Sequence, residues 1–168
     1  MQSDYGSMKV AISEREKEIA RLQTTGLPPF PPRVAPHGYG RSPGQNGCGL
    51  IVTNPGYPAF NVRIPPVTIG SSLYRLVFPR EVTQLLDRDH KCFFAAWLEH
   101  PTLPGLDGCH LFDVMRTDNI DAFNVAIVYQ DGEFRWYQSG CVIERDVEVA
   151  GGIRVRFVTQ ELIPQTPT

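Results

Sequence analysis

The chain lacks the motifs by which common enzymes are recognised. Its 168 residues contain no phosphate-binding G-x-x-x-x-G-K-[ST], no G-x-G-x-x-G, no G-x-S-x-G and no H-E-x-x-H. No N-x-S/T sequon occurs, and no two cysteines have the C-x-x-C spacing of a zinc ribbon. We therefore expect no catalytic residue, no cofactor and no metal site, although a missing motif does not by itself exclude an enzyme.

Long apolar runs and clustered basic residues are also missing. No stretch approaches the roughly 18 apolar residues of a membrane helix, and the N-terminus has no apolar signal-peptide core. The formal net charge is -2, and no run of lysine and arginine offers a surface for nucleic acid. These absences predict a cytoplasmic protein with no membrane span in this chain and no nucleic-acid partner.

Cysteine is scarce, with only four in the chain. The chain is long for a disulfide scaffold and carries no export signal, so we interpret the cysteines as reduced, buried, small hydrophobic residues. They are Cys48, Cys92, Cys109 and Cys141.

Residues 1–23 carry apolar residues at alternating spacings of three and four, with one arginine in the series, and predict a helix. The stripe is shorter than the three or four heptads typical of a coiled coil. A short helix lying on another surface and self-association into a homo-oligomer are therefore both open. The stripe consists of Tyr5, Met8, Ile12, Arg15, Ile19 and Leu22.

Residues 24–47 are rich in proline and glycine and are interpreted as a spacer that cannot enter a sheet interior. Pro28, Pro31 and Arg33 match the P-x-x-P-x-R pattern that polyproline-binding modules read. Such short matches arise freely in proline-rich linkers, so the spacer interpretation is favoured.

The pattern of residues 48–163 predicts short strands separated by turns. We expect residues 164–168 to form a disordered tail. The clearest element is a hairpin over residues 122–137, where Asp131-Gly132 separates two apolar runs. Residues 142–149 predict another strand, and only residues 108–119 look helical. About seven to eight strands at near-regular spacing are typical of a β-sandwich.

The tetrapeptide Ala-Phe-Asn-Val occurs twice, at residues 59–62 and 122–125. Alternation along both copies predicts that Phe60 and Phe123 point into one shared core. Residues 92–98 are apolar on both faces and should form a central strand, with Trp97 as the largest core side chain. Trp136 and Tyr137 are consecutive, so one of the two should face outward.

Residues 50–64, Leu-Ile-Val-Thr-Asn-Pro-Gly-Tyr-Pro-Ala-Phe-Asn-Val-Arg-Ile, and residues 125–137, Val-Ala-Ile-Val-Tyr-Gln-Asp-Gly-Glu-Phe-Arg-Trp-Tyr, resemble a group of uncharacterised bacterial proteins. In that group an immunoglobulin-like sandwich hangs from a membrane helix through a short helical segment. The resemblance covers roughly residues 48–160 and implies a fold and a non-enzymatic role. This chain lacks the membrane helix and has no clear Cys-Trp-Cys pattern, although Cys48, Trp97 and Cys141 follow in that order.

One cluster offers an alternative chemistry, because several potential ligands crowd into a short stretch. Cys92 and His100 would lie near 26 Å apart on an extended strand, so they cannot share an ion unless the strand breaks. A structural role is therefore favoured over a metal site or a Cys–His nucleophile. The cluster consists of His90, Cys92, His100, Cys109, His110 and Asp113.

Charged side chains elsewhere are interpreted as solvated surface. The acidic residues of the 81–90 connection lack the spacing of a calcium loop, and the arginines of the later strands have acidic neighbours. The first group is Glu81, Asp87 and Asp89, and the second is Arg135, Arg154 and Arg156 beside Glu133, Glu144, Asp146 and Glu148.

These observations predict a mainly β, immunoglobulin-like antiparallel sandwich that serves as a non-catalytic interaction or structural module for an unknown protein partner. The alternatives are a small metal-binding or hydrolytic enzyme that uses the 90–113 cluster, and a structural protein that assembles through its N-terminal helix.

Overall fold

The computed structural model describes residues 14, 16, 17, 30–85 and 90–163. The chain divides into two units, Met1–Pro31 and Pro32–Thr168. In the first unit, Glu14, Glu16 and Lys17 have helical backbone. The predicted stripe from Tyr5 to Leu22 and the expected tail at residues 164–168 lie outside the described residues, as does Pro28 of the proline pattern.

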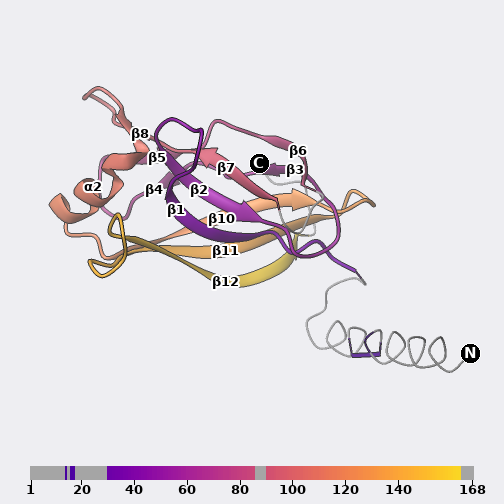
Figure 1. The fold of residues 1–168 in the computed structure, drawn as a ribbon. Helices are drawn as coiled ribbons and strands as arrows, with labels where there is room; N and C mark the ends of the chain where they lie inside the picture. The colour runs from indigo at the N-terminus through magenta and orange to yellow at the C-terminus, as the bar shows by residue number, and fades with distance from the viewer. Residues whose placement is uncertain (1–13, 15, 18–29, 86–89, 164–168) are drawn as a thin grey trace, which may run out of the picture. The chain divides into compact units, whose positions relative to one another are not determined.

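The second unit is mainly β, as predicted, and all strand pairs among its described residues are antiparallel (Figure 1). Two helical segments, η1 (Gly108–His110) and α2 (Leu111–Thr117), interrupt the strands. The strands are β1 (Ala35–Arg41), β2 (Cys48–Thr53), β3 (Ala59–Arg63), β4 (Val67–Thr68), β5 (Arg75–Val77), β6 (Val82–Leu85), β7 (Lys91–Ala95), β8 (Trp97–Glu99), β9 (Leu106–Asp107), β10 (Ala122–Gln130), β11 (Trp136–Arg145) and β12 (Ile153–Ile163).

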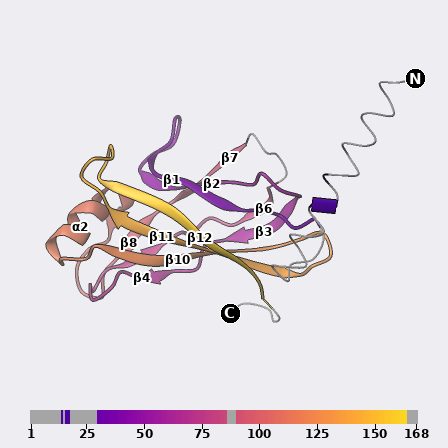
Figure 2. The same ribbon diagram turned by 90° about the horizontal axis from the view of Figure 1, so that it is seen from below.

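The strands form three sheets with the orders β1-β2-β7, β12-β11-β10-β3-β6 and β4-β5-β8-β9. β1 packs along β12, so the three-stranded sheet meets the five-stranded sheet at that strand (Figure 2). Strands β4, β5, β8 and β9 have only two or three residues each. The described residues therefore contain more strands than the seven to eight expected, in part because strands this short are too brief to show an alternating pattern.

The core draws side chains from all three sheets. On β10 and β11 the inward face follows the two-residue period of a strand, with Tyr129 and Tyr137 stacked at 5.7 Å between ring centroids. The largest fully buried side chains are Tyr129, Tyr137, Phe94, Leu50, Ile69, Leu76, Leu98, Leu111, Met115, Ile127, Ile143 and Val34.

The hairpin over residues 122–137 is confirmed as β10 and β11, but its turn differs from the expected one. An Asp-Gly pair in a two-residue turn needs positive φ at one or both positions, whereas the residue with positive φ in this loop is Phe134, at 64°. The Asp131 N–H donates to the carbonyl of Arg135 and the Phe134 N–H donates to that of Asp131, so the loop is longer than a two-residue turn. The Asp131 side chain fixes this loop by accepting hydrogen bonds from Glu133 N and Arg135 N.

The helical prediction for residues 108–119 is confirmed by η1 and α2. In the described part of the chain, no helix has the length and apolarity needed to cross a bilayer. The strand predicted over residues 142–149 is only partly correct, because β11 ends at Arg145. Asp146 N then donates to the carbonyl of Gly152, which closes a turn before β12.

The prediction of one central strand over residues 92–98 is wrong. The chain leaves the three-stranded sheet at Ala96, whose N–H donates to the carbonyl of Cys48, and enters the four-stranded sheet as β8. Residues 92–94 are buried on both faces of the sheet, although β7 is an edge strand. Trp97 is 45% exposed and covers Gly105, so it is not a core residue.

The two Ala-Phe-Asn-Val copies also differ. Asn61 has φ 50°, and this irregularity breaks the alternation in β3. Phe60 pairs with Gln130 and therefore shares the outer face of the five-stranded sheet, whereas Phe123 is buried on the opposite face. The expected shared core of Phe60 and Phe123 is therefore wrong, and Ala59 and Val62 are the buried residues of β3.

Two segments that were expected to be irregular contain strands. β1 lies within the presumed spacer 24–47 and pairs with β2, and its single proline coincides with a register shift between Pro36 and Gly38. β6 lies within the 81–90 connection. Of the acidic residues predicted there, Glu81 is exposed, whereas Asp87 and Asp89 lie outside the described residues.

Candidate functional site

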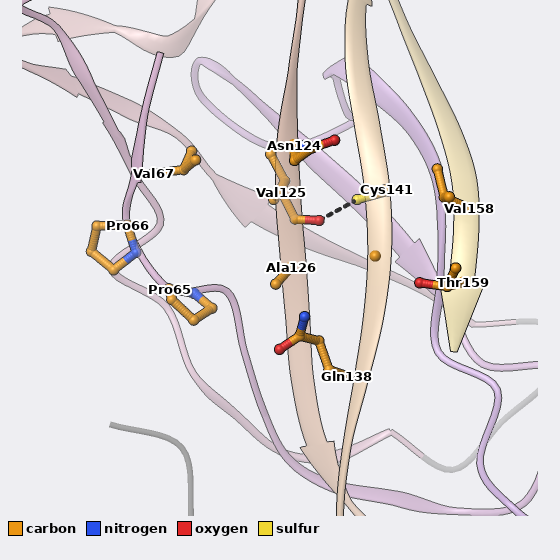
Figure 3. Close-up of a pocket in the computed structure, with 11 residues that line it drawn as sticks. Pro65, Pro66, Val67, Asn124, Val125, Ala126, Gln138, Cys141, Val158 and Thr159 are labelled. Carbon is orange, nitrogen blue, oxygen red and sulfur yellow. Dashed lines mark hydrogen bonds between the residues drawn. The ribbon is translucent and has the colours of Figure 1, made fainter. Parts of the chain in front are cut away.

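A trough of about 360 Å³ crosses the outer face of the five-stranded sheet (Figure 3). Its walls come from the segment after β3 on one side and from β12 on the other, and its floor from β10 and β11. The lining residues are Pro65, Pro66, Val67, Asn124, Val125, Ala126, Gln138, Gly140, Cys141, Val158 and Thr159.

The trough exists because small residues meet in one row of the sheet. Ala126 pairs with Gly140, and Gly140 pairs with Thr159 on the next strand. Paired residues point to the same face, so this row presents a methyl group, a hydrogen atom and a short hydroxyl side chain. Outer-face rows on either side carry the longer side chains of Asn124 and Gln138, and the result is a hollow running across the strands.

A bulge in β12 shapes the far wall of the trough. The register between β11 and β12 shifts between Gly140 and Cys141, which pair with Thr159 and Phe157, so Val158 is the extra residue. Val158 is 48% exposed and lines the trough. The opposite wall consists of Pro65 and Pro66, which fix the chain in an extended path.

Two side-chain amides border the trough and retain their hydrogen-bonding capacity. Within the described ranges, no hydrogen bond engages the side chain of Asn124 or Gln138. Figure 3 shows the Gln138 amide reaching from β11 toward Ala126 on β10. Each amide offers an acceptor oxygen and two N–H donors, so the site can bind a ligand that carries both kinds of group.

Cys141 lies beneath the trough and is not a nucleophile. The residue is 1% exposed, and its thiol donates to the carbonyl of Val125 at 3.4 Å. Burial raises the pKa of the Cys141 thiol to about 12, so it stays protonated at neutral pH. Burial also raises the pKa of the Cys92 thiol, an effect that the nearby charge of Arg80 partly opposes.

The predicted 90–113 cluster does not come together as one site. His100 Nδ1 accepts the backbone N–H groups of Thr102 and Leu103 at 3.1 and 2.9 Å, and its ring contacts Tyr74. The remaining members lie apart: Cys92 is buried in β7, His90 and His110 are exposed, and Asp113 pairs with Arg116 on α2.

The expectation of four reduced cysteines is also wrong. Cys48 and Cys109 form a disulfide, whereas Cys92 and Cys141 are free and buried. The sequence offered no direct signal for this pairing, since the two residues are 61 positions apart. Among the residues that the structure describes, the one group of three potential metal ligands is Cys48, Asp107 and Cys109.

The arginines of the later strands pair with acidic neighbours, as the mixed-charge interpretation predicted. Arg135 pairs with Asp131 and Glu133, and Arg154 and Arg156 pair with Asp146 and Glu144 respectively.

Trp136 and Tyr137 point to opposite faces, as predicted. Tyr137 is buried, and the half-buried Trp136 ring lies under the Arg63 guanidinium at 5.6 Å. This contact places a partly covered aromatic ring on the same face as the trough.

A buried polar cluster, which sequence reasoning missed, fixes the hairpin end of the sheet. Burial of Asp131 opposes its ionised form, but hydrogen bonds from Arg135, Tyr137 and the Glu133 N–H outweigh burial and lower the carboxyl pKa. The Tyr137 hydroxyl donates to Asp131 Oδ2 at 2.9 Å. The pKa of the Tyr137 hydroxyl is raised, mainly by burial and to a smaller extent by its hydrogen bond to the Asp131 carboxylate. The cluster is internally satisfied, so we assign it a structural role.

Comparison with known proteins finds no match to this chain among protein-family models, curated proteins or solved structures.

Proposed function

We propose that this chain is a non-catalytic interaction module, built as an immunoglobulin-like β-sandwich, whose trough binds an extended and uncharged segment of a protein partner. The mainly β fold with antiparallel sheets supports the sandwich. The observation that carries the binding role is the pair of unengaged amides, Asn124 and Gln138, on either side of a floor made of small residues.

The chemistry of the lining favours a peptide over other ligands. A peptide group has one donor and one acceptor, which a side-chain amide matches on both counts. None of the lining residues is charged or aromatic, so the trough offers neither an ion partner nor a stacking platform for a sugar ring. Pro65, Pro66 and Val158 provide apolar walls for an aliphatic side chain.

The dimensions of the trough suit a short extended segment. Neighbouring strands lie about 4.8 Å apart, so the path across β10, β11 and β12 is about 10 Å long, the span of about three extended residues. The volume of about 360 Å³ lies at the small end of the range for ligand sites. We therefore expect recognition of a short motif rather than of a folded surface.

Selection of random linear peptides on the immobilised full chain tests this proposal. We expect enrichment of uncharged sequences with an aliphatic or small residue at the centre. Ala126→Leu fills the trough floor and should weaken binding of a selected peptide at least about tenfold, or about 1.4 kcal/mol.

Ala122→Leu is the matched control. Ala122 lies four residues before Ala126 on β10 and on the same face of the sheet, but it does not line the trough. This substitution should leave binding unchanged. If no peptide is enriched, or if enriched peptides bind the Ala126→Leu protein as well as the unaltered chain, the trough is not the binding site.

A further inference from the structure

A second site lies where β2 begins and β9 ends, on elements that take no part in the trough. Cys48 is the first residue of β2, Asp107 is the last of β9, and Cys109 lies in η1. One ligand atom from each residue lies within 4.8 Å of the other two. Two sulfur atoms and a carboxylate oxygen therefore converge from two distant parts of the chain.

The Asp107 carboxylate is held in place by the backbone of its two neighbours in the site. Its Oδ1 accepts the N–H of Cys109 at 2.8 Å and that of Cys48 at 3.4 Å. Its Oδ2 accepts no hydrogen bond within the part of the chain that the structure describes. A Cβ at residue 47 would lie 2.5 Å from Oδ2, so glycine at this position leaves space beside this oxygen that any other residue would fill.

The backbone around the site is fixed independently of the disulfide. The Tyr39 hydroxyl donates to the carbonyl of Gly108 at 2.7 Å, and Gly108 N donates to the carbonyl of Ala96 at 3.0 Å. Ala96 N donates in turn to the carbonyl of Cys48. This chain of hydrogen bonds keeps Cys48 beside residues 107–109 when the sulfur atoms are not bonded to each other.

We propose that Cys48, Asp107 and Cys109 form a redox-gated zinc site: a disulfide under oxidising conditions and a dithiolate–carboxylate site for one Zn²⁺ under reducing conditions. The bound carboxylate oxygen is Asp107 Oδ2. Hydrogen bonds from backbone amides to the other oxygen orient this ligand, as outer-shell partners do in established metal sites.

The chemistry needs a dithiol or phosphine reductant. A dithiol transfers two electrons and two protons to the Cys48–Cys109 bond and itself becomes a cyclic disulfide. Zn²⁺ then displaces one proton from each thiol, so two Zn–S bonds form and two protons are released. Tetrahedral bonds of about 2.3 Å require the sulfur atoms to separate to about 3.8 Å, which side-chain rotation allows at the Cα separation of 4.8 Å.

Zinc is the cation that suits this ligand set. Thiolate sulfur binds Mg²⁺ and Ca²⁺ poorly, whereas two thiolates with one carboxylate match the borderline softness of Zn²⁺. Three protein ligands leave a fourth position for water. The site is partly exposed at Asp107 and Cys109, so the ion can enter from solvent.

Zinc titration of the full chain tests the proposal. Protein reduced with a phosphine and freed of reductant without oxygen should bind one Zn²⁺ per chain in competition with a chromophoric chelator, and the oxidised protein should bind none. Co²⁺ in place of zinc should give thiolate-to-metal charge-transfer absorption. If reduction loosens the fold, circular dichroism should show that zinc restores the β signal.

Asp107→Asn retains both thiols and should weaken zinc binding at least about tenfold, which corresponds to about 1.4 kcal/mol. Cys92→Ala/Cys141→Ala is the matched control and should bind zinc like the unaltered chain. Stoichiometric zinc binding by Cys48→Ser/Cys109→Ser, an unchanged affinity in Asp107→Asn, or no binding by the reduced chain would each overturn the assignment.

Discussion

The Cys48–Cys109 bond should account for a large part of the stability of the second unit. We consider its removal by the double substitution Cys48→Ala/Cys109→Ala. The hydrogen bonds that join Ala96 to Cys48 and to Gly108 involve backbone atoms only, so the substitution leaves them in place. The main consequence is therefore a less constrained unfolded chain.

The magnitude follows from the length of the closed loop. The two cysteines are 61 positions apart, and the loop-closure entropy for about 62 residues corresponds to about 4 kcal/mol at 25 °C. This is a substantial share of the roughly 5–15 kcal/mol by which domains are typically stable. With a urea m-value of about 2 kcal/mol per molar, the unfolding midpoint should fall by about 2 M.

Urea unfolding of the full chain, followed by circular dichroism, measures this shift. The m-value should rise in the variant, because an uncrosslinked unfolded chain exposes more surface. Thiol titration in denaturant should find two reactive thiols in the unreduced chain and four after reduction. Four thiols before reduction, or a midpoint shift below about 0.5 M at constant m-value, would contradict a stabilising Cys48–Cys109 bond.

Three further predictions concern the packing and titration of the second unit. Gly49→Ala places a Cβ at 2.1 Å from the backbone oxygen of Phe94 and should cost about 3 kcal/mol or more in urea unfolding, whereas Gly38→Ala meets nothing within 4 Å and should be nearly neutral. Asp131→Asn should lower the free energy of unfolding by about 3 kcal/mol at neutral pH. It should also flatten the acid limb of the stability curve, because a lowered carboxyl pKa stabilises the fold above the unfolded value near 3.9 and that stability disappears as pH falls through the folded value. Burial raises the pKa of Tyr129 to about 12, so its contribution is complete below the unfolded pKa of about 10 and is lost as pH rises toward 12. Tyrosinate absorbance should therefore show a class of tyrosines that ionise only together with alkaline unfolding.

Local patterns in the sequence predicted those structural features that depend on a single strand or hairpin. The hairpin was readable because β10 and β11 are long and alternate for most of their length. Its turn was not, because the conformation depends on the Asp131 carboxylate accepting from Glu133, Arg135 and Tyr137 at once. Dipeptide preferences carry no information about such a cluster.

Features that depend on contacts between distant parts of the chain could not be predicted from local sequence patterns. The apolar run over residues 92–98 reads as one strand, since nothing in it marks Ala96 as the point where the chain changes sheets. Phe60 lies on the outer face because the positive φ at Asn61 interrupts the alternation of β3. Likewise, the cysteine pairing and the trough depend on which residues become neighbours across strands, and register is set by the whole sheet.

The trough has the properties of a feature maintained against the preferences of a sheet. Glycine inside a strand weakens it by about 0.5–1 kcal/mol relative to alanine, and a β-branched residue at 140 would add cross-strand contacts. A Cβ at Gly140 would lie 2.9 Å from Thr159 Oγ1, a side-chain atom that can rotate away, so sterics alone do not require glycine here. The neighbouring bulge exposes Val158 instead of burying it. Gly140 and the exposed Val158 therefore make the sheet less stable at one place on the outer face, between Asn124 and Gln138. A binding role for the trough explains why less stabilising residues occupy these positions.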